Sequence, residues 1–223
     1  MPNPASNAAP KPPRLPADVP PSYSGSGDLS ALGADGLAEH LLYDSDNADG
    51  LDLEDTVFRD CLFRRVGLHG APLLRASFGE CRLEDLNVPV LEAANSGWRN
   101  TRIVRSRIGS AELHGASLRS VAFDGGKLGY VNLRAANLGD VLFRDVIIDE
   151  LDLGGASLER VAFEDCRIDS LVLNGARLKD TDLRGAQMRR LTGVSGLRGA
   201  TIDGFQLQDL APILAAEAGL TVL

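Results

Sequence analysis

Apolar residues return at every fifth position along much of this chain. The clearest stretch is ASLERVAFEDCRIDSLVLNGA, residues 156–176, whose fifth positions are Leu158, Phe163, Ile168 and Leu173. A step of five advances about 500° around an α-helix, so successive apolar side chains would lie about 140° apart and form no stripe. Along a straight strand, the same step would send successive side chains to opposite faces. The period therefore excludes both an amphipathic helix and a straight strand.

A second series of residues, two positions before each apolar centre, explains the period. Its members are small or aliphatic: Ala156, Val161, Cys166, Leu171 and Ala176. Positions i−2 and i lie on one face of an extended segment, so both side chains point inward if the chain turns before the next five residues. The repeat predicts a short extended side followed by a corner.

A longer period of twenty residues gives the number of sides in one coil. Phe123, Phe143 and Phe163 are spaced by twenty. The same spacing relates Leu118, Leu138, Leu158 and Leu178. Four sides of five residues make one coil, which predicts a square-sectioned β-solenoid that stacks like residue on like. We expect Phe143 to be buried between Phe123 and Phe163.

Several short runs resemble a known repeat unit. VNLRAANL, LDLGGASL, LNGARL and TDLRGAQM are similar to the A(D/N)Lxx units of the pentapeptide-repeat family, and the resemblance covers residues 51–190. Every fifth residue from Leu53 to Met188 is apolar in that span. The resemblance implies an all-β solenoid, a right-handed quadrilateral β-helix of about seven coils with a short C-terminal capping helix.

The pattern divides the chain into four parts. Residues 1–28 hold eight of the eleven prolines and no secretory signal, which predicts a disordered tail, with docking into a partner's aromatic groove as the alternative. Residues 29–50 have no clean fivefold register and are expected to form an irregular first coil or an N-terminal cap. The β-helix occupies 51–204. Within it, 86–98 is expected to form a bulge or protruding loop, because Pro89 cannot donate a ladder hydrogen bond.

The C-terminal segment, 205–223, has helical periodicity. Apolar residues recur at helical spacing before Gly219, at Leu207, Leu210, Ile213 and Leu214. They predict a short amphipathic helix that covers the last coil, since an open coil would expose unpaired strand groups. The same face could instead join two protomers, as C-terminal elements do in dimeric members of the family. A monomer and a homodimer through this element both stay open.

Residues able to perform catalysis or bind a metal are not grouped in the sequence. Asp44, Asp46 and Asp49 suggest a calcium loop, but an EF-hand needs glycine where the chain has Asp49 and glutamate where it has Asp55. The histidines are scattered, and a convex column provides no dry cleft in which carboxylate pKa values could be pushed apart. We therefore expect no enzymatic activity, no cofactor and no metal site. An enzyme or a metal-binding protein is kept only as a remote alternative.

The three cysteines all occupy the small inward position of the repeat. Cys61 and Cys81 are twenty residues apart, so they should be stacked neighbours about 4.8 Å apart, within reach of a disulfide. Because the chain carries no export signal or membrane-spanning run, we expect a cytoplasmic protein with reduced thiols.

Charge is unevenly distributed over the repeat region. The formal net charge is −8. Acidic residues dominate 140–169, and Asp145 and Asp165 are stacked like charges, which oppose coil stability. We interpret this acidic band as a candidate partner-binding surface made of Asp140, Asp145, Asp149, Glu150, Asp165 and Asp169. A basic band precedes it at Arg99, Arg102, Arg105 and Arg107.

The family resemblance also implies a possible partner. Quinolone-resistance members of the family mimic duplex DNA and bind DNA gyrase or topoisomerase IV. Duplex DNA carries a charge about every 1.7 Å, so a seven-coil column would need about twenty unbalanced acids to copy it. Acids and bases nearly cancel over 51–190. The first hypothesis is therefore a non-catalytic protein-binding scaffold with an unidentified partner. The alternative is a DNA mimic that protects gyrase or topoisomerase IV against quinolones, with no direct binding of nucleic acid or membrane.

Overall fold

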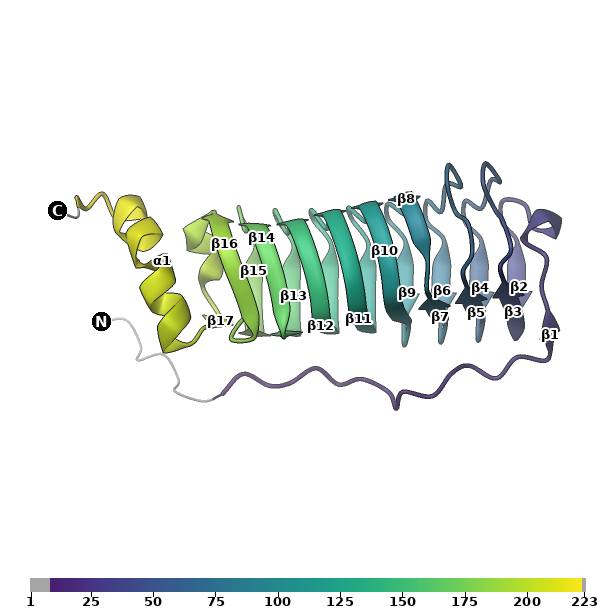
Figure 1. The fold of residues 1–223 in the computed structure, drawn as a ribbon, viewed down its shortest axis with the longest axis horizontal. Helices are drawn as coiled ribbons and strands as arrows, with labels where there is room; N and C mark the ends of the chain where they lie inside the picture. Colours follow the sequence, from purple (N-terminus) through teal and green to yellow (C-terminus); the bar gives the residue numbers. More distant parts are fainter. Residues whose placement is uncertain (1–8, 222–223) are drawn as a thin grey trace.

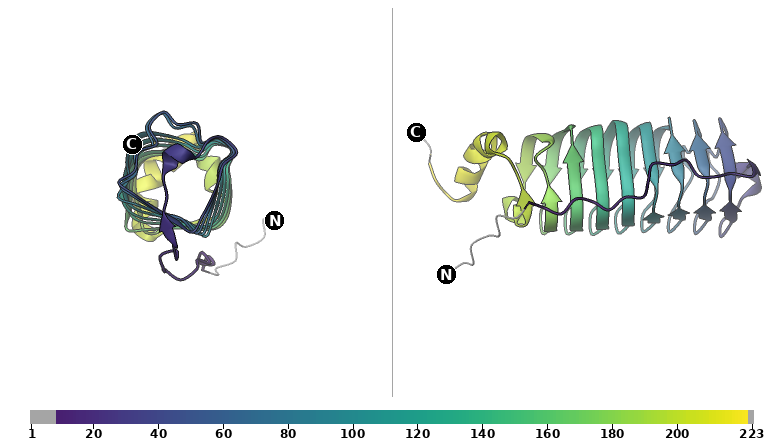
Figure 2. Two further views of the ribbon diagram at one scale, coloured as in Figure 1. Left: turned by 90° about the vertical axis from the view of Figure 1, so that its right-hand side faces the viewer. Right: turned by 90° about the horizontal axis from the view of Figure 1, so that it is seen from below.

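The computed structural model, which describes residues 9–221, shows one long column of stacked coils (Figure 1). Its strands belong to a single 17-stranded sheet in which every strand pair is parallel. Seen from the end, the sheet winds around a closed, four-sided interior (Figure 2). The column has about nine turns, more than the seven predicted, because it begins before residue 51.

Strands are short in the first coils and long in the middle ones. The short strands of the first coils are β1 (Gly25–Ser26), β2 (Leu37–Glu39), β3 (Leu41–Asp44), β4 (Val57–Arg59), β5 (Leu62–Arg64), β6 (Ser77–Gly79), β7 (Arg82–Glu84), β8 (Asn87–Glu92) and β9 (Gly97–Arg99). The later strands, most of them long, are β10 (Arg102–Glu112), β11 (Ser117–Asn132), β12 (Asn137–Asp152), β13 (Ser157–Glu164), β14 (Cys166–Val172), β15 (Arg177–Asp182), β16 (Ala186–Thr192) and β17 (Ala200–Thr201). The helical segments are η1 (Leu29–Ala31), η2 (Val194–Leu197) and α1 (Gly204–Glu217).

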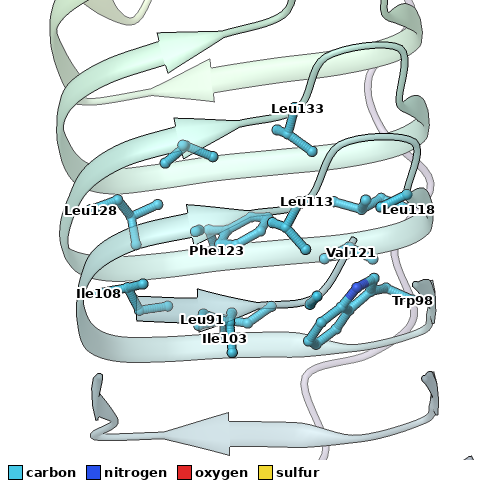
Figure 3. Packing of buried hydrophobic residues seen from close by; sticks show 14 of the residues in the cluster. Leu91, Trp98, Ile103, Ile108, Leu113, Leu118, Val121, Phe123, Leu128 and Leu133 are labelled. Carbon is cyan, nitrogen blue, oxygen red and sulfur yellow. The ribbon is translucent and has the colours of Figure 1, made fainter. Parts of the chain in front are cut away.

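The interior is built by the predicted period of twenty. Phe123, Phe143 and Phe163 lie in register, and their rings stack at centroid distances of 4.7 and 4.8 Å with planes 4° apart. Phe143 is fully buried, as predicted. Figure 3 shows the interior of the neighbouring coils, where one side chain from each side points inward: Leu118, Phe123, Leu128 and Leu133.

The corners lie two residues after the apolar centres, and most of them adopt positive φ. Examples are Gly125 at 71°, Asp140 at 58°, Asp145 at 54° and Asp165 at 51°. This left-handed conformation is free for glycine and is adopted more readily by Asp and Asn than by other residues. The frequent Asp and Gly residues at these positions therefore have a backbone reason that is independent of any partner.

The segment 29–50, predicted to form an irregular first coil or an N-terminal cap, contains a short capping segment followed by a regular coil. Strands β2 and β3 pair in register with β4 and β5 one coil later. The centres of its sides are Ala38, Tyr43 and Ala48, each at most 1% exposed. The sequence concealed this register because two of the three centres are alanines. The end is closed by η1, whose Leu29 is buried and donates its N–H to Asp46 Oδ2 at 2.8 Å.

The segment 86–98, predicted to bulge or protrude, is also regular. Strand β8 pairs with β10 in the register Val88 to Ile108 and Val90 to Ser110. Pro89 is exposed and points outward, so its ring does not enter the interior. The stacked residue in the next coil is Gly109, where a Cβ would approach the Pro89 carbonyl oxygen to 2.5 Å. Glycine at this outward position permits a close approach of the two backbones, and the coil continues through Pro89 without interruption.

Residues 9–28, predicted to be part of a disordered tail, lie against the outside of the column and run along much of its length (Figure 1). We call residues 9–24 the strap. Ser24 donates its N–H to the His40 carbonyl at 2.8 Å, and the following strand, β1, pairs with β3. Residues 1–8 of the predicted tail lie outside the described residues.

The C-terminal helix closes the other end. Asp203 caps α1 by accepting hydrogen bonds from the N–H groups of Phe205 and Gln206, both at 2.8 Å. Gln206 Nε2 donates to the carbonyls of Leu183 and Ala186 in the last coils, at 2.5 and 2.6 Å. No helix among residues 9–221 has the length and apolar character needed to cross a membrane.

The four predicted helix residues have different positions. Leu210 is 3% exposed, and Ile213 and Leu214 pack partly buried against the core, so these three contribute to the cap. Leu207 is 51% exposed and does not belong to the group of side chains packed against the core. The turn before the helix shifts the register, since Thr181 pairs with Ala200, nineteen residues on rather than twenty.

Candidate partner-binding surface

The acidic band predicted from the sequence lies on strands β12 to β14, but one of its members is tightly paired. Asp140 accepts hydrogen bonds from Arg160 at 2.6 and 2.8 Å and from the Arg14 N–H of the strap at 2.9 Å. Its side chain is only 15% exposed. The Arg160 guanidinium holds the pKa of Asp140 below its usual range. Asp140 therefore stabilises the stack between two coils.

Two further members are also paired with bases. Asp149 lies 2.9 Å from Lys127 Nζ, and Asp169 lies 3.6 Å from Arg167 Nε. Asp149 and Asp169 were predicted to belong to the acidic band, and these pairs reduce the negative charge that they contribute to it. Glu150 is exposed and forms no ion pair within the described part of the chain.

Asp145 and Asp165 are stacked aspartates of the acidic band that have no basic partner among residues 9–221. Both are exposed corner residues with positive φ, stacked one coil apart, and neither forms an ion pair among residues 9–221. The sequence argument attributed their like-charge stacking to a partner. The corner conformation accounts for aspartate at both positions, because Asp tolerates the left-handed region. Their free carboxylates are nevertheless available at the surface.

These two aspartates line an open groove beside α1, which we call the C-terminal groove. It has a volume of about 660 Å³ and lies between the helix and the last coils. Two apolar side chains on its lining are exposed, Phe205 at 81% and Ile147 at 37%. Further charged residues on its lining are Arg167, Arg184, Arg189, Asp203 and Asp209. The groove thus combines free carboxylates, guanidinium groups and exposed apolar surface.

Sequence reasoning missed the apolar residues of this groove. A signal for Ile147 existed, since it precedes the inward centre Ile148 and so occupies an outward position where an apolar side chain is unusual. Phe205 gave no comparable signal, because its direction depends on how α1 docks against the column.

Two of the four arginines of the basic band are neutralised by ion pairs. Arg105 Nε and a terminal nitrogen bind Asp85 at 2.9 and 3.0 Å. Arg102 lies 2.7 Å from Asp124 and 3.3 Å from Asp18 of the strap. An alternating charge ladder runs beside it, with Asp124 also bound to Arg144 at 2.5 Å. The column is therefore less strongly divided into acidic and basic ends than the sequence suggested.

The cysteines and the suspected calcium residues have structural surroundings. Cys61, Cys81 and Cys166 are free and buried, and burial raises the pKa of the Cys166 thiol to about 11. Asp49 Oδ1 accepts a hydrogen bond from the His69 N–H at 2.8 Å, bridging two coils. Among the residues that the structure describes, no three His, Cys, Asp or Glu side chains are grouped so that they could hold a metal ion.

The coil geometry decides the architecture. Its regular sides are five residues long, with inward side chains at the centre and two positions before it, and coils repeat every twenty residues. The chain has the fold of a pentapeptide-repeat protein. No family model matches the chain, and no curated protein matches it.

Two of the solved structures to which the chain is similar are those of QnrB1 and HetL. A trypsin-treated form of QnrB1, a plasmid-mediated fluoroquinolone resistance protein, is 18% identical, with 89% of this chain and 96% of that chain covered and a TM-score of 0.43. HetL, a pentapeptide-repeat protein involved in heterocyst differentiation regulation in the cyanobacterium Nostoc sp. strain PCC 7120, is 19% identical, with 75% and 89% covered and a TM-score of 0.27. These likenesses transfer no function.

Proposed function

We propose that this pentapeptide-repeat protein is a cytoplasmic, non-catalytic scaffold that binds a protein partner at its C-terminal groove. The supporting observation is that Asp145 and Asp165, which lack ion pairs among residues 9–221, share one groove with the exposed Phe205 and Ile147. Exposed aromatic and aliphatic side chains rimmed by charges are typical of protein interfaces. The partner should present basic groups next to apolar ones. Free buried thiols are in keeping with a reducing compartment.

The test compares two charge-matched double variants. Asp145→Lys with Asp165→Lys reverses the groove carboxylates, whereas Asp35→Lys with Glu92→Lys reverses two exposed acids elsewhere on the column. The purified variants and the parent are used for quantitative capture from the native lysate, followed by mass spectrometry. We expect a protein retained by the parent and the control variant to be lost from the groove variant. Identical retention by all three proteins would remove the proposal.

The same groove could accept a second copy of the chain. Phe205 and Leu207 of α1 are both exposed, so a homodimer through the C-terminal element would bury them. Light scattering of the parent and of Phe205→Ala distinguishes the two cases. A dimer mass that falls to the monomer mass in the variant would assign the groove to self-association rather than to another protein.

The topoisomerase alternative is supported by the free carboxylates of Asp145 and Asp165 but weakened by the ion pairs of Asp140, Asp149 and Asp169. Paired carboxylates contribute little to a field that copies DNA. A gyrase supercoiling assay, with and without a fluoroquinolone, tests it directly. Inhibition or quinolone protection by the parent, lost in the Asp145→Lys and Asp165→Lys variant, would favour DNA mimicry. No effect of the parent at any concentration would exclude it.

A further inference from the structure

The strap follows a single outward column of the solenoid. This strap column contains the residues that precede the inward centres on one side, and they stack in register: Leu42, Leu62, Arg82, Arg102, Ala122, Leu142, Ala162 and Asp182. Outward positions of a coil face water, so a run of three apolar residues and a pair of stacked arginines are both unusual there. Each is matched by a strap residue.

The apolar part of the strap column holds one leucine of the strap. Ala122, Leu142 and Ala162 point outward, yet they are only 1, 6 and 7% exposed. They form a small apolar cluster separate from the interior core, and Leu15 packs against it. We call these three residues the leucine notch.

The basic part of the strap column holds one carboxylate of the strap. Arg82 and Arg102 are stacked neighbours, and their side chains are only 12 and 13% exposed. Asp18 pairs with both, through Arg82 Nη1 and through Arg102 Nε at 3.3 Å. Glu84 of the column also pairs with Arg82, and Asp124 of the column lies 2.7 Å from Arg102. Asp18 adds a carboxylate that contacts both guanidinium groups and so further offsets their mutual repulsion.

Main-chain contacts fix the direction of the strap. Asp140 accepts from the Arg14 N–H at 2.9 Å, and Arg102 donates to the Pro16 carbonyl at 3.3 Å. These bonds need no particular strap side chain, whereas the leucine notch and the arginine pair select a leucine and an acid three residues later. Backbone bonds for affinity and spaced pockets for specificity are how proteins recognise extended peptides. Prolines at 12, 13 and 16 fix φ and lower the entropy lost on binding.

We propose that the strap column is a binding site for an extended segment of a partner protein in which an acidic residue follows a leucine by three positions, and that residues 11–18 occupy this site in cis. The proposal rests on the scaffold function but uses a different surface from the C-terminal groove. A tethered segment has an effective concentration in the millimolar range, so it shields the site from weak competitors. A partner segment must either bind the strap column tightly enough to compete with the tethered strap, or bind when the strap is displaced.

The experiment uses the full-length chain and a labelled peptide. The probe is a fluorescein-labelled peptide with the sequence of residues 9–20, APKPPRLPADVP. The parent protein is titrated into the peptide, and binding is followed by fluorescence anisotropy. The same titration uses a double variant, Leu15→Ala with Asp18→Ala, whose own strap has lost both anchoring side chains. We expect saturable binding to the variant at least about tenfold tighter than to the parent, because the parent's strap competes. A second protein, with residues 10–20 replaced by a Gly-Ser sequence of equal length, should bind at least as tightly as the first variant.

Controls address the notch and the arginine pair separately. Adding Leu142→Arg to the strap variant should abolish peptide binding, and so should replacing the leucine and aspartate of the peptide by alanine. Binding should also weaken with added salt, because the Asp18 contact is ionic. Thermal melts monitored by circular dichroism verify that each protein is folded. Absence of saturable binding to both strap variants, or binding that Leu142→Arg leaves unchanged, would overturn the proposal whatever happens at the C-terminal groove.

Discussion

The stacked phenylalanines give the sharpest test of the interior, and Phe143→Ala is the change that probes it. Phe143 is fully buried, with Phe123 and Phe163 stacked on its two faces at 4.7 and 4.8 Å. Truncating a buried phenylalanine to alanine costs about 3–5 kcal/mol. Two stacking contacts are lost, each of about 0.5–1.5 kcal/mol beyond area burial. Both neighbours are held in strands that cannot collapse into the cavity, so we expect a destabilisation near the upper end, about 5 kcal/mol.

The assay is urea unfolding followed by circular dichroism at the β-sheet band. If the free energy of unfolding falls by about 3 kcal/mol per molar urea, the unfolding midpoint should fall by about 1.7 M. The matched control is Phe205→Ala, which removes the same side chain from a position that is 81% exposed and should shift the midpoint by under about 0.2 M. Equal shifts for the two variants would refute the register assigned to the phenylalanine column.

Three further outcomes are expected. Arg160 lowers the pKa of Asp140, so their pair stabilises the fold fully above the unfolded-state pKa of about 4, and this contribution is lost as the pH falls through the lowered pKa of the folded state; the melting temperature of the parent should therefore exceed that of Arg160→Gln at pH 7, and the difference should shrink steadily as the pH is lowered below about 4. Because burial raises the pKa of Cys166 to about 11 and Cys61 and Cys81 are also buried, Ellman's reagent at pH 8 should label the thiols only after unfolding in guanidinium, and labelling of the folded protein would contradict the burial of at least one of them. Gln206→Ala should remove the two hydrogen bonds that join the helix to the Leu183 and Ala186 carbonyls, cost about 1–3 kcal/mol and promote association in light scattering, whereas an unchanged melting temperature and mass would show that the helix does not close the column.

The inward columns were predictable because one side chain every five residues is a direct consequence of the coil geometry. That rule identified the burial of Phe143 and the stacking of Phe123 and Phe163 from spacing alone. It failed at Ala38 and Ala48, where small residues fill inward positions without giving a clear apolar signal. Periodicity reports a coil only where the inward residues are large enough to stand out.

The outer surface was far less predictable, because it depends on where long side chains reach. The register places Asp149 and Asp169 in one column, but Lys127 and Arg167 approach from other positions to pair with them. The position of the strap was equally hidden, since proline content is typical both of disordered tails and of bound extended segments. The stacked pair Arg82 and Arg102, spaced by twenty, was only a weak signal for the strap, because Glu84 and Asp124 of the column also pair with these arginines.

The path of the strap has a mechanical consequence for a fold of this kind. In a solenoid, each repeat touches only the repeats beside it, so the ends can fray while the middle stays folded. The strap joins positions that are far apart along the axis, from Asp180, which accepts the Lys11 N–H at 3.4 Å, to His40, which accepts from Ser24. Because the strap contacts coils near both ends of the column, unfolding of one end removes strap contacts that stabilise the other end. Unfolding should therefore be more cooperative with the strap bound than with it displaced.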